Sequence, residues 1–301
     1  MAQDSEVAVD FLIIGCTSEI GSRLLRNLLR LGYRVNGIRF QSKCELAGVN
    51  HECESVDLFR VDMNELALKF NVKKLILVSW YTQHNDFWSS SLNTDWGQMY
   101  RRLCQAFINI GVDEVVGIGS CAEYSWLLPD HISELTETLP ASVYGNEKLA
   151  LFNWLSERTT NLLWIRPFFV YGPNDHPDKL IQSAITKRAA KSVISIQNSQ
   201  HYVDYVFIED VALVTSRLIS GNATGVFNVG TGQASSPVEV AQSVGCRFEV
   251  LQPTSGALDA RHPRFVVADN QKIVEALGSI EWTSLKSGIS NMMLSREISK
   301  L

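Results

Sequence analysis

The chain has 301 residues, 46% hydrophobic and 20% charged, which is the composition of a globular protein with one or two domains. Its net charge of −5 argues against a nucleic-acid-binding protein that works through a basic surface. No apolar run reaches the roughly 18–20 residues that span a bilayer, and the acidic N-terminus lacks a signal-peptide pattern. We therefore expect a cytoplasmic protein with no membrane partner, whose six cysteines are mostly buried thiols.

The first half of the sequence alternates between short apolar runs and segments of helical periodicity. Strands are expected at residues 7–15, 33–40, 73–80, 113–120 and 161–172, and helices at residues 19–32, 96–111 and 144–158. This alternation predicts an α/β fold with a doubly wound parallel sheet, the Rossmann arrangement. We assign residues 1–172 to that domain, with 201–231 returning to it, and residues 173–301 to a smaller C-terminal substrate-binding lobe.

The first expected strand leads into the turn GCTSEIGSRL, in which Gly15 and Gly21 are six residues apart. Glycines at such a turn let a dinucleotide pyrophosphate approach the N-terminus of the following helix. The pattern is imperfect, because Ser18 stands where G-x-x-G-x-x-G has its middle glycine. We predict a cofactor-binding turn formed by Gly15, Thr17, Ser18, Glu19, Ile20 and Gly21.

The end of the second expected strand indicates which dinucleotide binds. An acidic residue there would bind the 2′-hydroxyl of NAD, whereas a basic residue would accept the 2′-phosphate of NADP. The segment GIRFQSK has no acid but contains Arg39, Ser42 and Lys43, so we predict NADP(H) rather than NAD(H), with Arg39 clamping the phosphate. The alternative is that Arg39 is only a solvated strand end. Asp62 is a candidate acceptor near the adenine.

A tyrosine and a lysine lie four residues apart in the helix expected at 144–158. At this spacing Tyr144 and Lys148 share one helical face, and a nearby ammonium would lower the tyrosine pKa from about 10. That shift is what a phenol needs for acid–base work near neutral pH. Ser120 ends the preceding expected strand, where ligands bind in open α/β sheets. The competing interpretations are an ordinary aromatic with a surface charge, and a simple turn serine.

Together these features resemble the extended short-chain dehydrogenase/reductase family, of the NAD-dependent epimerase/dehydratase type that acts on nucleotide sugars. The matching pieces follow the family's order: Gly15 with Gly21, Ser120 in GSCAEY, Tyr144-x-x-x-Lys148, RPFFVYGP (166–173), YVDYVFIEDVA (202–212) and GVFNVGTG (225–232). The resemblance implies that Tyr144 exchanges a proton with the sugar oxygen while Ser120 polarises that oxygen. Lys148 would lower the tyrosine pKa and hold the nicotinamide ribose.

The resemblance also suggests further contacts and a quaternary structure. It implies cofactor contacts by Ser79 and Arg166, and a nucleotide-diphosphate sugar bound by Tyr81, Asn93, Cys121, Phe169, Lys179 and Arg261. Arg261 is the best candidate for clamping the diphosphate. The histidines show no close ligand spacing, so no metal is assigned. A homodimer through the helices near 92–110 and 144–158 is expected.

Departures from the family pattern narrow the expected reaction. The family's 4,6-dehydratases carry Asp and Glu after the catalytic Ser or Thr, but Cys121 and Ala122 stand there in this chain. Ala122 also replaces the base cysteine of the epimerase-reductases. Two reactions remain: NADPH-dependent reduction of a dTDP- or CDP-linked 4-keto-6-deoxy sugar, and 4-epimerisation with a tightly bound cofactor. The NADP-like segment favours the reductase, and an NADP(H)-binding protein without turnover is the further alternative.

Overall fold

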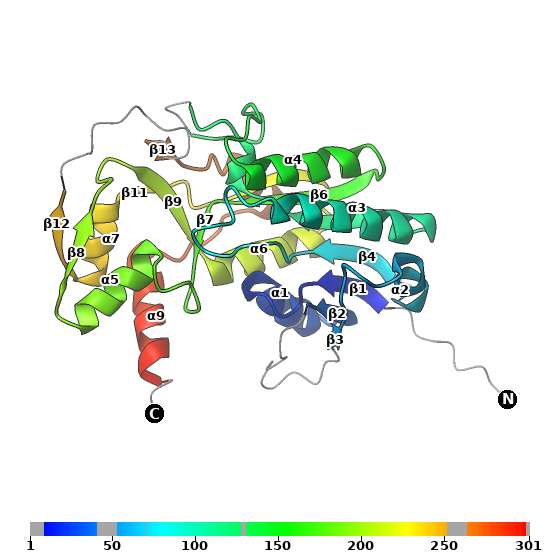
Figure 1. The fold of residues 1–301 in the computed structure, drawn as a ribbon, viewed down its shortest axis with the longest axis horizontal. Helices are drawn as coiled ribbons and strands as arrows, with labels where there is room; N and C mark the ends of the chain where they lie inside the picture. The colour runs from blue at the N-terminus through cyan, green and yellow to red at the C-terminus, as the bar shows by residue number, and fades with distance from the viewer. Residues whose placement is uncertain (1–8, 41–52, 71, 128–130, 252–263, 299–301) are drawn as a thin grey trace.

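The computed structural model describes residues 9–40, 53–70, 72–127, 131–251 and 264–298. Its centre is a seven-stranded parallel sheet in the order β10-β6-β5-β4-β1-β2-β3 (Figure 1). The strands are β1 (Val9–Ile14), β2 (Val35–Arg39), β3 (Cys53–Ser55), β4 (Val72–Leu77), β5 (Glu114–Ile118), β6 (Asn161–Pro167) and β10 (Gly225–Val229). The predicted doubly wound α/β fold is confirmed.

Helices cover both faces of this sheet. One face carries α2 (Met63–Phe70), α3 (Leu92–Asn109) and α4 (Val143–Ser156), and the other carries α1 (Glu19–Arg30), α6 (Ile208–Ser220) and α8 (Gln271–Leu277). Successive side chains of β1 point to opposite faces of the sheet. Leu12 and Ile14 pack toward α2–α4, while Phe11 and Ile13 pack toward α1 and α6. Burial on both faces explains why the parallel strands are continuous apolar runs.

A second, smaller layer of structure lies beyond the carboxyl ends of the central strands (Figure 1). Here β9 (Tyr202–Phe207) pairs with β7 (Phe169–Tyr171), β11 (Ala234–Ser235) and β13 (Phe265–Val266), and β8 (Val193–Ile196) pairs with β12 (Arg247–Val250). The helices of this part are α5 (Leu180–Ala189), α7 (Pro237–Val244) and α9 (Leu285–Ile298). Tyr171, Ile185, Phe207, Val240 and Met292 share its core.

Two expected elements differ from those observed. The strand expected at 161–172 divides, because β6 ends at Pro167 and the chain crosses to pair with β9 as β7. The Phe168 N–H donates to the Val229 carbonyl at 3.0 Å just before this crossing. The helix expected from residue 96 begins at Leu92 as α3. In the segment from β9 to β10, β9 belongs to the second sheet. The next two elements return to the central sheet, because α6 packs on α1 and β10 pairs with β6.

Asp204 joins the two parts of the molecule. Its fully buried carboxylate accepts hydrogen bonds from the Thr231 N–H (2.9 Å), the Thr231 hydroxyl (2.6 Å) and the Gly232 N–H (2.9 Å). A longer bond comes from the Ala268 N–H at 3.3 Å. Burial raises the pKa of Asp204 and these donors oppose the rise. The motifs YVDYVF and NVGTG therefore meet at a structural contact between β9 and the turn after β10.

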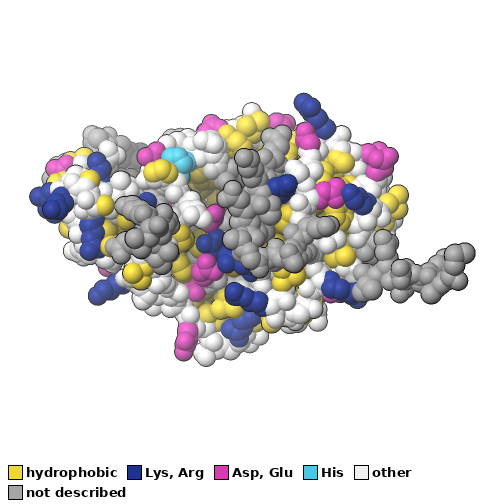
Figure 2. Space-filling view, turned by 90° about the horizontal axis from the view of Figure 1, so that it is seen from below, with side chains coloured by type: hydrophobic (Ala, Val, Ile, Leu, Met, Phe, Trp, Pro, Cys, Tyr) yellow, Lys and Arg dark blue, Asp and Glu magenta, His cyan; other side chains and the backbone are white. Residues whose placement is uncertain are grey.

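The face that carries α1 and α9 mixes acidic and basic side chains (Figure 2). Among the pairs formed in the molecule, Arg34 lies 3.4 Å from Asp10 and Lys69 lies 2.6 Å from Glu54. Such exposed pairs contribute little to folding stability, typically below about 1 kcal/mol each. None of the helices in the described ranges combines the length and apolarity that crossing a membrane requires.

Candidate active site

Ser120 and Tyr144 meet at the carboxyl end of β5. Ser120 follows this strand and caps a short 3-10 helix, η1 (Cys121–Glu123), by accepting from the Ala122 N–H at 3.1 Å. Ser142 caps α4 in the same way by accepting from the Gly145 N–H at 3.0 Å. A Cβ on Gly145 would lie 2.3 Å from the Ala122 carbonyl oxygen, so only glycine lets α4 start against η1. This contact brings the Ser120 side chain close enough to the Tyr144 phenol to oppose the rise in the Tyr144 pKa.

Lys148 lies one turn further along α4, with its side chain enclosed. It is 3% exposed, and its ammonium donates to the Ile118 carbonyl at 2.6 Å. The same nitrogen lies 4.1 Å from the centre of the Trp80 ring and 5.9 Å from that of Tyr144. Burial lowers the pKa of Lys148 below its ordinary value of 10.5, and the negative charge of Glu123 opposes this change. The predicted triad of Ser120, Tyr144 and Lys148 is thus gathered in one place.

The direction of the Tyr144 pKa shift differs from the expectation. Burial raises the pKa of Tyr144 above 10.0, and the hydrogen bond from Ser120 only partly opposes the rise. The predicted lowering by Lys148 is wrong for this structure, because the ammonium is bound to the Ile118 carbonyl rather than to the phenol. The phenol therefore keeps its proton at neutral pH, which is the form that donates rather than accepts a proton.

A buried carboxylate beneath this site was missed by sequence reasoning. Glu123 is 0% exposed and accepts from the Ser120 N–H at 2.8 Å, from Arg166 Nε at 2.7 Å and from Trp164 Nε1 at 3.0 Å. The signal was present in the sequence, since Ser120 and Glu123 have the spacing of a capping box. Arg166, predicted to contact the cofactor, instead pairs with Glu123 and stacks 4.4 Å from the Tyr124 ring. The Arg166 side chain is 2% exposed, and its predicted cofactor contact stays a prediction.

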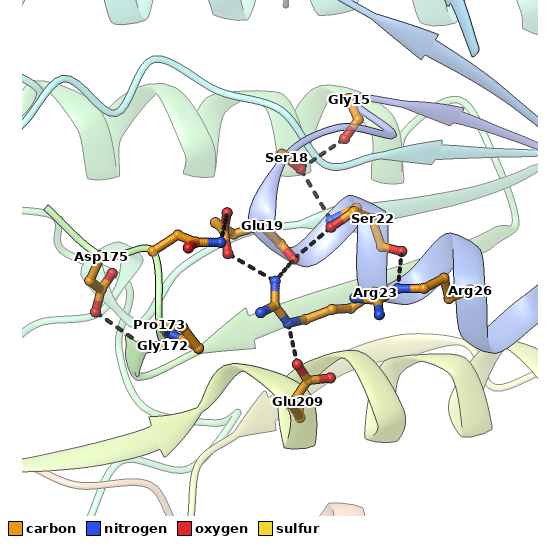
Figure 3. A network of polar contacts seen from close by, with 12 residues as sticks. Gly15, Ser18, Glu19, Ser22, Arg23, Arg26, Gly172, Pro173, Asp175 and Glu209 are labelled. Carbon is orange, nitrogen blue, oxygen red and sulfur yellow. Dashed lines mark hydrogen bonds and ion pairs between the residues drawn. The ribbon is translucent and has the colours of Figure 1, made fainter. Parts of the chain in front are cut away.

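The turn between β1 and α1 has the shape that a dinucleotide pyrophosphate needs. Gly15 has φ +92°, and a Cβ on Gly21 would lie 2.1 Å from the Gly15 carbonyl oxygen. The Ser18 hydroxyl donates to that carbonyl at 2.8 Å and accepts from the Gly21 N–H at 3.1 Å (Figure 3). Ser18 thus closes the turn and caps α1 in place of the missing glycine. The same segment contains Thr17 and leads through Glu19 and Ile20 into the first turn of α1. The residues of this turn therefore fit the pyrophosphate of the cofactor.

Glu19 has a second task at this turn. Its carboxylate accepts from Arg23 Nη1 at 2.8 Å and from Asn174 Nδ2 at 3.0 Å, and Asn174 lies in the loop after β7. Arg23, only 7% exposed, also donates to Glu209 on α6 at 2.6 Å (Figure 3). These bonds fix the start of α1 to α6 and to the second part of the molecule.

The residues predicted to select the cofactor are only partly described. Arg39 ends β2, and no acid stands between Val35 and Phe40. Ser42 and Lys43 lie outside the described residues, so the preference for NADP(H) stays a prediction. Asp62 caps α2 by accepting from the Asn64 N–H at 2.8 Å, which gives it a structural task. Ser79, after β4, shares a hydrogen bond of 2.8 Å with the Tyr100 hydroxyl and lies against Gly15.

Asn93, predicted to bind substrate, has a different role. It is 0% exposed, and its side chain accepts from Trp80 Nε1 at 2.8 Å and donates to the Phe87 and Ser90 carbonyls at 2.6 and 2.9 Å. All its amide groups are engaged, so Asn93 shapes the loop between β4 and α3. These bonds give Asn93 a structural role in the loop, and its predicted substrate contact stays a prediction.

The other predicted substrate residues are spread over the edge of the site. The Tyr81 hydroxyl donates to Asp86 at 2.5 Å, Lys179 pairs with Asp175 at 2.6 Å, and Phe169 lies 6.3 Å from the Trp126 ring. Cys121 is 5% exposed, and burial raises the pKa of its thiol. Arg261 lies outside the described residues, so its role as a diphosphate clamp is untested.

Comparison with known proteins establishes the family. The sequence model of the NAD dependent epimerase/dehydratase family matches residues 11–230. The chain belongs to this family. A curated relative, dTDP-L-rhamnose 4-epimerase of Burkholderia thailandensis, is 28% identical over 181 residues, which are 55% of this chain and 49% of the relative. The match therefore spans about half the length of that relative.

Two solved structures have the same fold as this chain. MoeE5 in complex with UDP-glucose and NAD has a TM-score of 0.78 at 22% identity, covering 97% of this chain and 100% of that one. UDP-glucuronic acid 4-epimerase from Bacillus cereus, in complex with UDP-glucuronic acid and NAD, has a TM-score of 0.81 at 20% identity, covering 97% and 100%. The predicted membership of the epimerase/dehydratase family is confirmed by the match to the family's sequence model, and the likeness to these structures confirms the fold.

Proposed function

We propose that the chain is an NADPH-dependent reductase of a dTDP- or CDP-linked 4-keto-6-deoxy sugar. The observation that carries the proposal is the Ser120–Tyr144 hydroxyl pair at the carboxyl end of β5. Burial raises the pKa of Tyr144, so the phenol is protonated and suited to donate to a keto oxygen. An enzyme that begins by oxidising an alcohol needs the opposite, a phenolate ready to accept a proton.

Each residue of the site has a defined task in this reaction. When bound, the nicotinamide cofactor supplies the hydride to C4 of the sugar. The Tyr144 hydroxyl gives its proton to the C4 oxygen, and the Ser120 hydroxyl donates a hydrogen bond to the same atom. The Lys148 ammonium, fixed by the Ile118 carbonyl, keeps a positive charge beside the phenol as that proton leaves. Trp80, whose ring is stacked on Tyr100 at 5.6 Å, covers the Lys148 ammonium at 4.1 Å.

The neighbours of Ser120 support reduction rather than dehydration. Elimination of water needs an acid and a base beside the catalytic hydroxyl. Burial raises the pKa of the Cys121 thiol, Ala122 has no ionisable group, and Glu123 is turned inward to Arg166. No carboxylate of η1 therefore reaches the position at which a substrate would bind.

A nucleotide-sugar 4-epimerase is the second candidate, favoured by the similarity to dTDP-L-rhamnose 4-epimerase. An epimerase would carry a tightly bound NAD(P) and show no net consumption of it. An NADP(H)-binding protein without hydride transfer is the third outcome. The absence of an acid at the end of β2 supports the reductase over the epimerase, because family epimerases usually carry an Asp there.

Loss of NADPH absorbance tests the proposal. Purified protein would be mixed with NADPH and a panel of dTDP-, CDP- and GDP-linked 4-keto-6-deoxy sugars, with a Tyr144→Phe variant alongside. We expect substrate-dependent loss of NADPH that disappears in the variant and identifies the nucleotide. Tight NADPH binding with no loss for any sugar would reject the reductase. Interconversion of 4-epimers without net loss would then establish the epimerase.

A further inference from the structure

Two histidines and an aspartate come together outside the active site. His84, in the loop between β4 and α3, stacks on His176, in the loop after β7, with ring centres 4.4 Å apart. Asp178 lies beside them, with its carboxylate 3.7 Å from His176 Nδ1. One ligand atom from each residue lies within 4.8 Å of the other two. Sequence spacing gave no sign of this cluster, because 92 residues separate His84 from His176 and only the fold joins them.

These loops already meet across the edge of the cofactor-binding turn. Asn174, two residues before His176, donates to Glu19 in the first turn of α1 at 3.0 Å. Asp175 accepts from the Gly172 N–H at 3.1 Å and pairs with Lys179, which shapes the same loop. Residues 172–179 therefore run from α1 to the loop after β4, with His176 and Asp178 at the far end.

We propose that His84, His176 and Asp178 form a binding site for a divalent transition-metal ion, with Zn²⁺ the best match. Imidazole nitrogens and one carboxylate oxygen are the ligands of three-residue zinc sites, whose fourth position is held by water. Hard cations such as Mg²⁺ and Ca²⁺ prefer an all-oxygen shell, which this cluster does not offer. Its half-buried to exposed position leaves room for the water ligand and for entry of the ion.

A metal ion at this cluster would have a structural role, because His84 and His176 lie on different loops. The bound ion would fasten the loop after β4 to residues 172–179 and so hold the latter over the start of α1.

Isothermal titration of ZnCl₂ into the tag-free, chelator-treated full chain tests the site. We expect one Zn²⁺ per chain, with affinity weakened at least about tenfold in His84→Ala and in His176→Ala. His131→Ala is the matched control, because His131 is an exposed histidine that packs against the Phe265 ring instead, at 5.4 Å. The zinc affinity of the His131→Ala variant should equal that of the unaltered chain.

A spectroscopic and a hydrogen-exchange measurement identify the ligands independently. Co²⁺ in place of Zn²⁺ should give the visible bands of a tetrahedral nitrogen–oxygen site, and His176→Ala should abolish them. Amides of residues 172–179 should exchange more slowly with Zn²⁺ than without it. The proposal would be overturned if the His84 and His176 variants bound zinc as tightly as the unaltered chain does. It would also be overturned if the unaltered chain bound no zinc.

Discussion

At the scale of single residues, the proposed reaction depends on Tyr144 holding its proton and on Lys148 being charged, which it is below its lowered pKa. Tyr144→Phe removes the proton donor and leaves the ring in contact with Phe87 and Trp88. We expect kcat to fall about 10²–10⁴-fold, the usual contribution of general acid catalysis, with little change in KM. Steady-state kinetics with the sugar identified above would measure both constants. A rise in KM with unchanged kcat would instead show that Tyr144 only binds substrate.

The pH dependence belongs to Lys148 and Glu123. Burial lowers the pKa of Lys148, so the ammonium is present below that pKa and is lost as the pH rises through it. We expect kcat/KM to decrease on the alkaline side with a midpoint below 10.5. Glu123→Gln removes the charge that raises the pKa of Lys148, so this limb should move to lower pH. Glu147→Gln, one residue from Lys148 but facing Arg101 at 3.4 Å, should leave the profile in place.

Replacing Glu123 should also lower the stability of the fold. Removing one partner of a buried ion pair leaves the other charge uncompensated, and Arg166 has no solvent to turn to. We expect Glu123→Gln to lower the free energy of unfolding by about 3 kcal/mol. Urea denaturation followed by tryptophan fluorescence would measure this, with Glu147→Gln as the control expected to change little. An unchanged stability would mean that Arg166 finds another partner in the variant.

At the scale of elements, the start of α1 depends on a glycine that nothing else can replace. In Gly21→Ala the new methyl would meet the Gly15 carbonyl at 2.1 Å, so α1 must move away from β1. We expect dinucleotide affinity to fall at least about tenfold, because the first-turn amides leave the pyrophosphate. Fluorescence titration with NADPH would measure the affinity. Ser22→Ala, the next position on the helix, should bind as the unaltered chain does.

The elements that the sequence predicted best are those with the strongest pattern. Strands buried on both faces are apolar runs, so β1, β4 and β5 were predictable. β3 and α2 were not predicted, because β3 has only three residues and α2 only eight. The division of β6 from β7 was missed as well, because it depends on which strand the chain pairs with after Pro167. That choice is tertiary and leaves no periodicity in the sequence.

The site residues, too, were predictable only where a local sequence motif marks them. Ser120, Tyr144 and Lys148 could be predicted to lie together from short motifs, since each motif places its residue at a defined end of an element. The ion pair of Arg166 was not predicted, because its partner, Glu123, is 43 residues earlier in the chain. A buried charge is known only once its neighbours are known, and sequence alone does not supply them.

At the scale of the whole molecule, assembly through α3 and α4 stays a prediction. These helices pack on each other, with Arg101 and Glu147 3.4 Å apart, and their outward positions include Gln98, Gln105 and Ala150. We expect sedimentation velocity to show a dimer that Ala150→Glu converts to a monomer. Ala189→Glu, an equally exposed position at the end of α5, should leave the dimer intact. A monomer for the unaltered chain would reject this interface.

The strand order has a consequence during synthesis. β6 ends at Pro167, but the strand that covers its open edge, β10, begins only at Gly225. A ribosome adding about 5–20 residues per second leaves that edge unpaired for several seconds. During this time the nascent chain presents unsatisfied backbone groups beside an apolar strand, the kind of edge that recruits other chains. Until β10 has been made, the edge of β6 is therefore open to pairing with another chain.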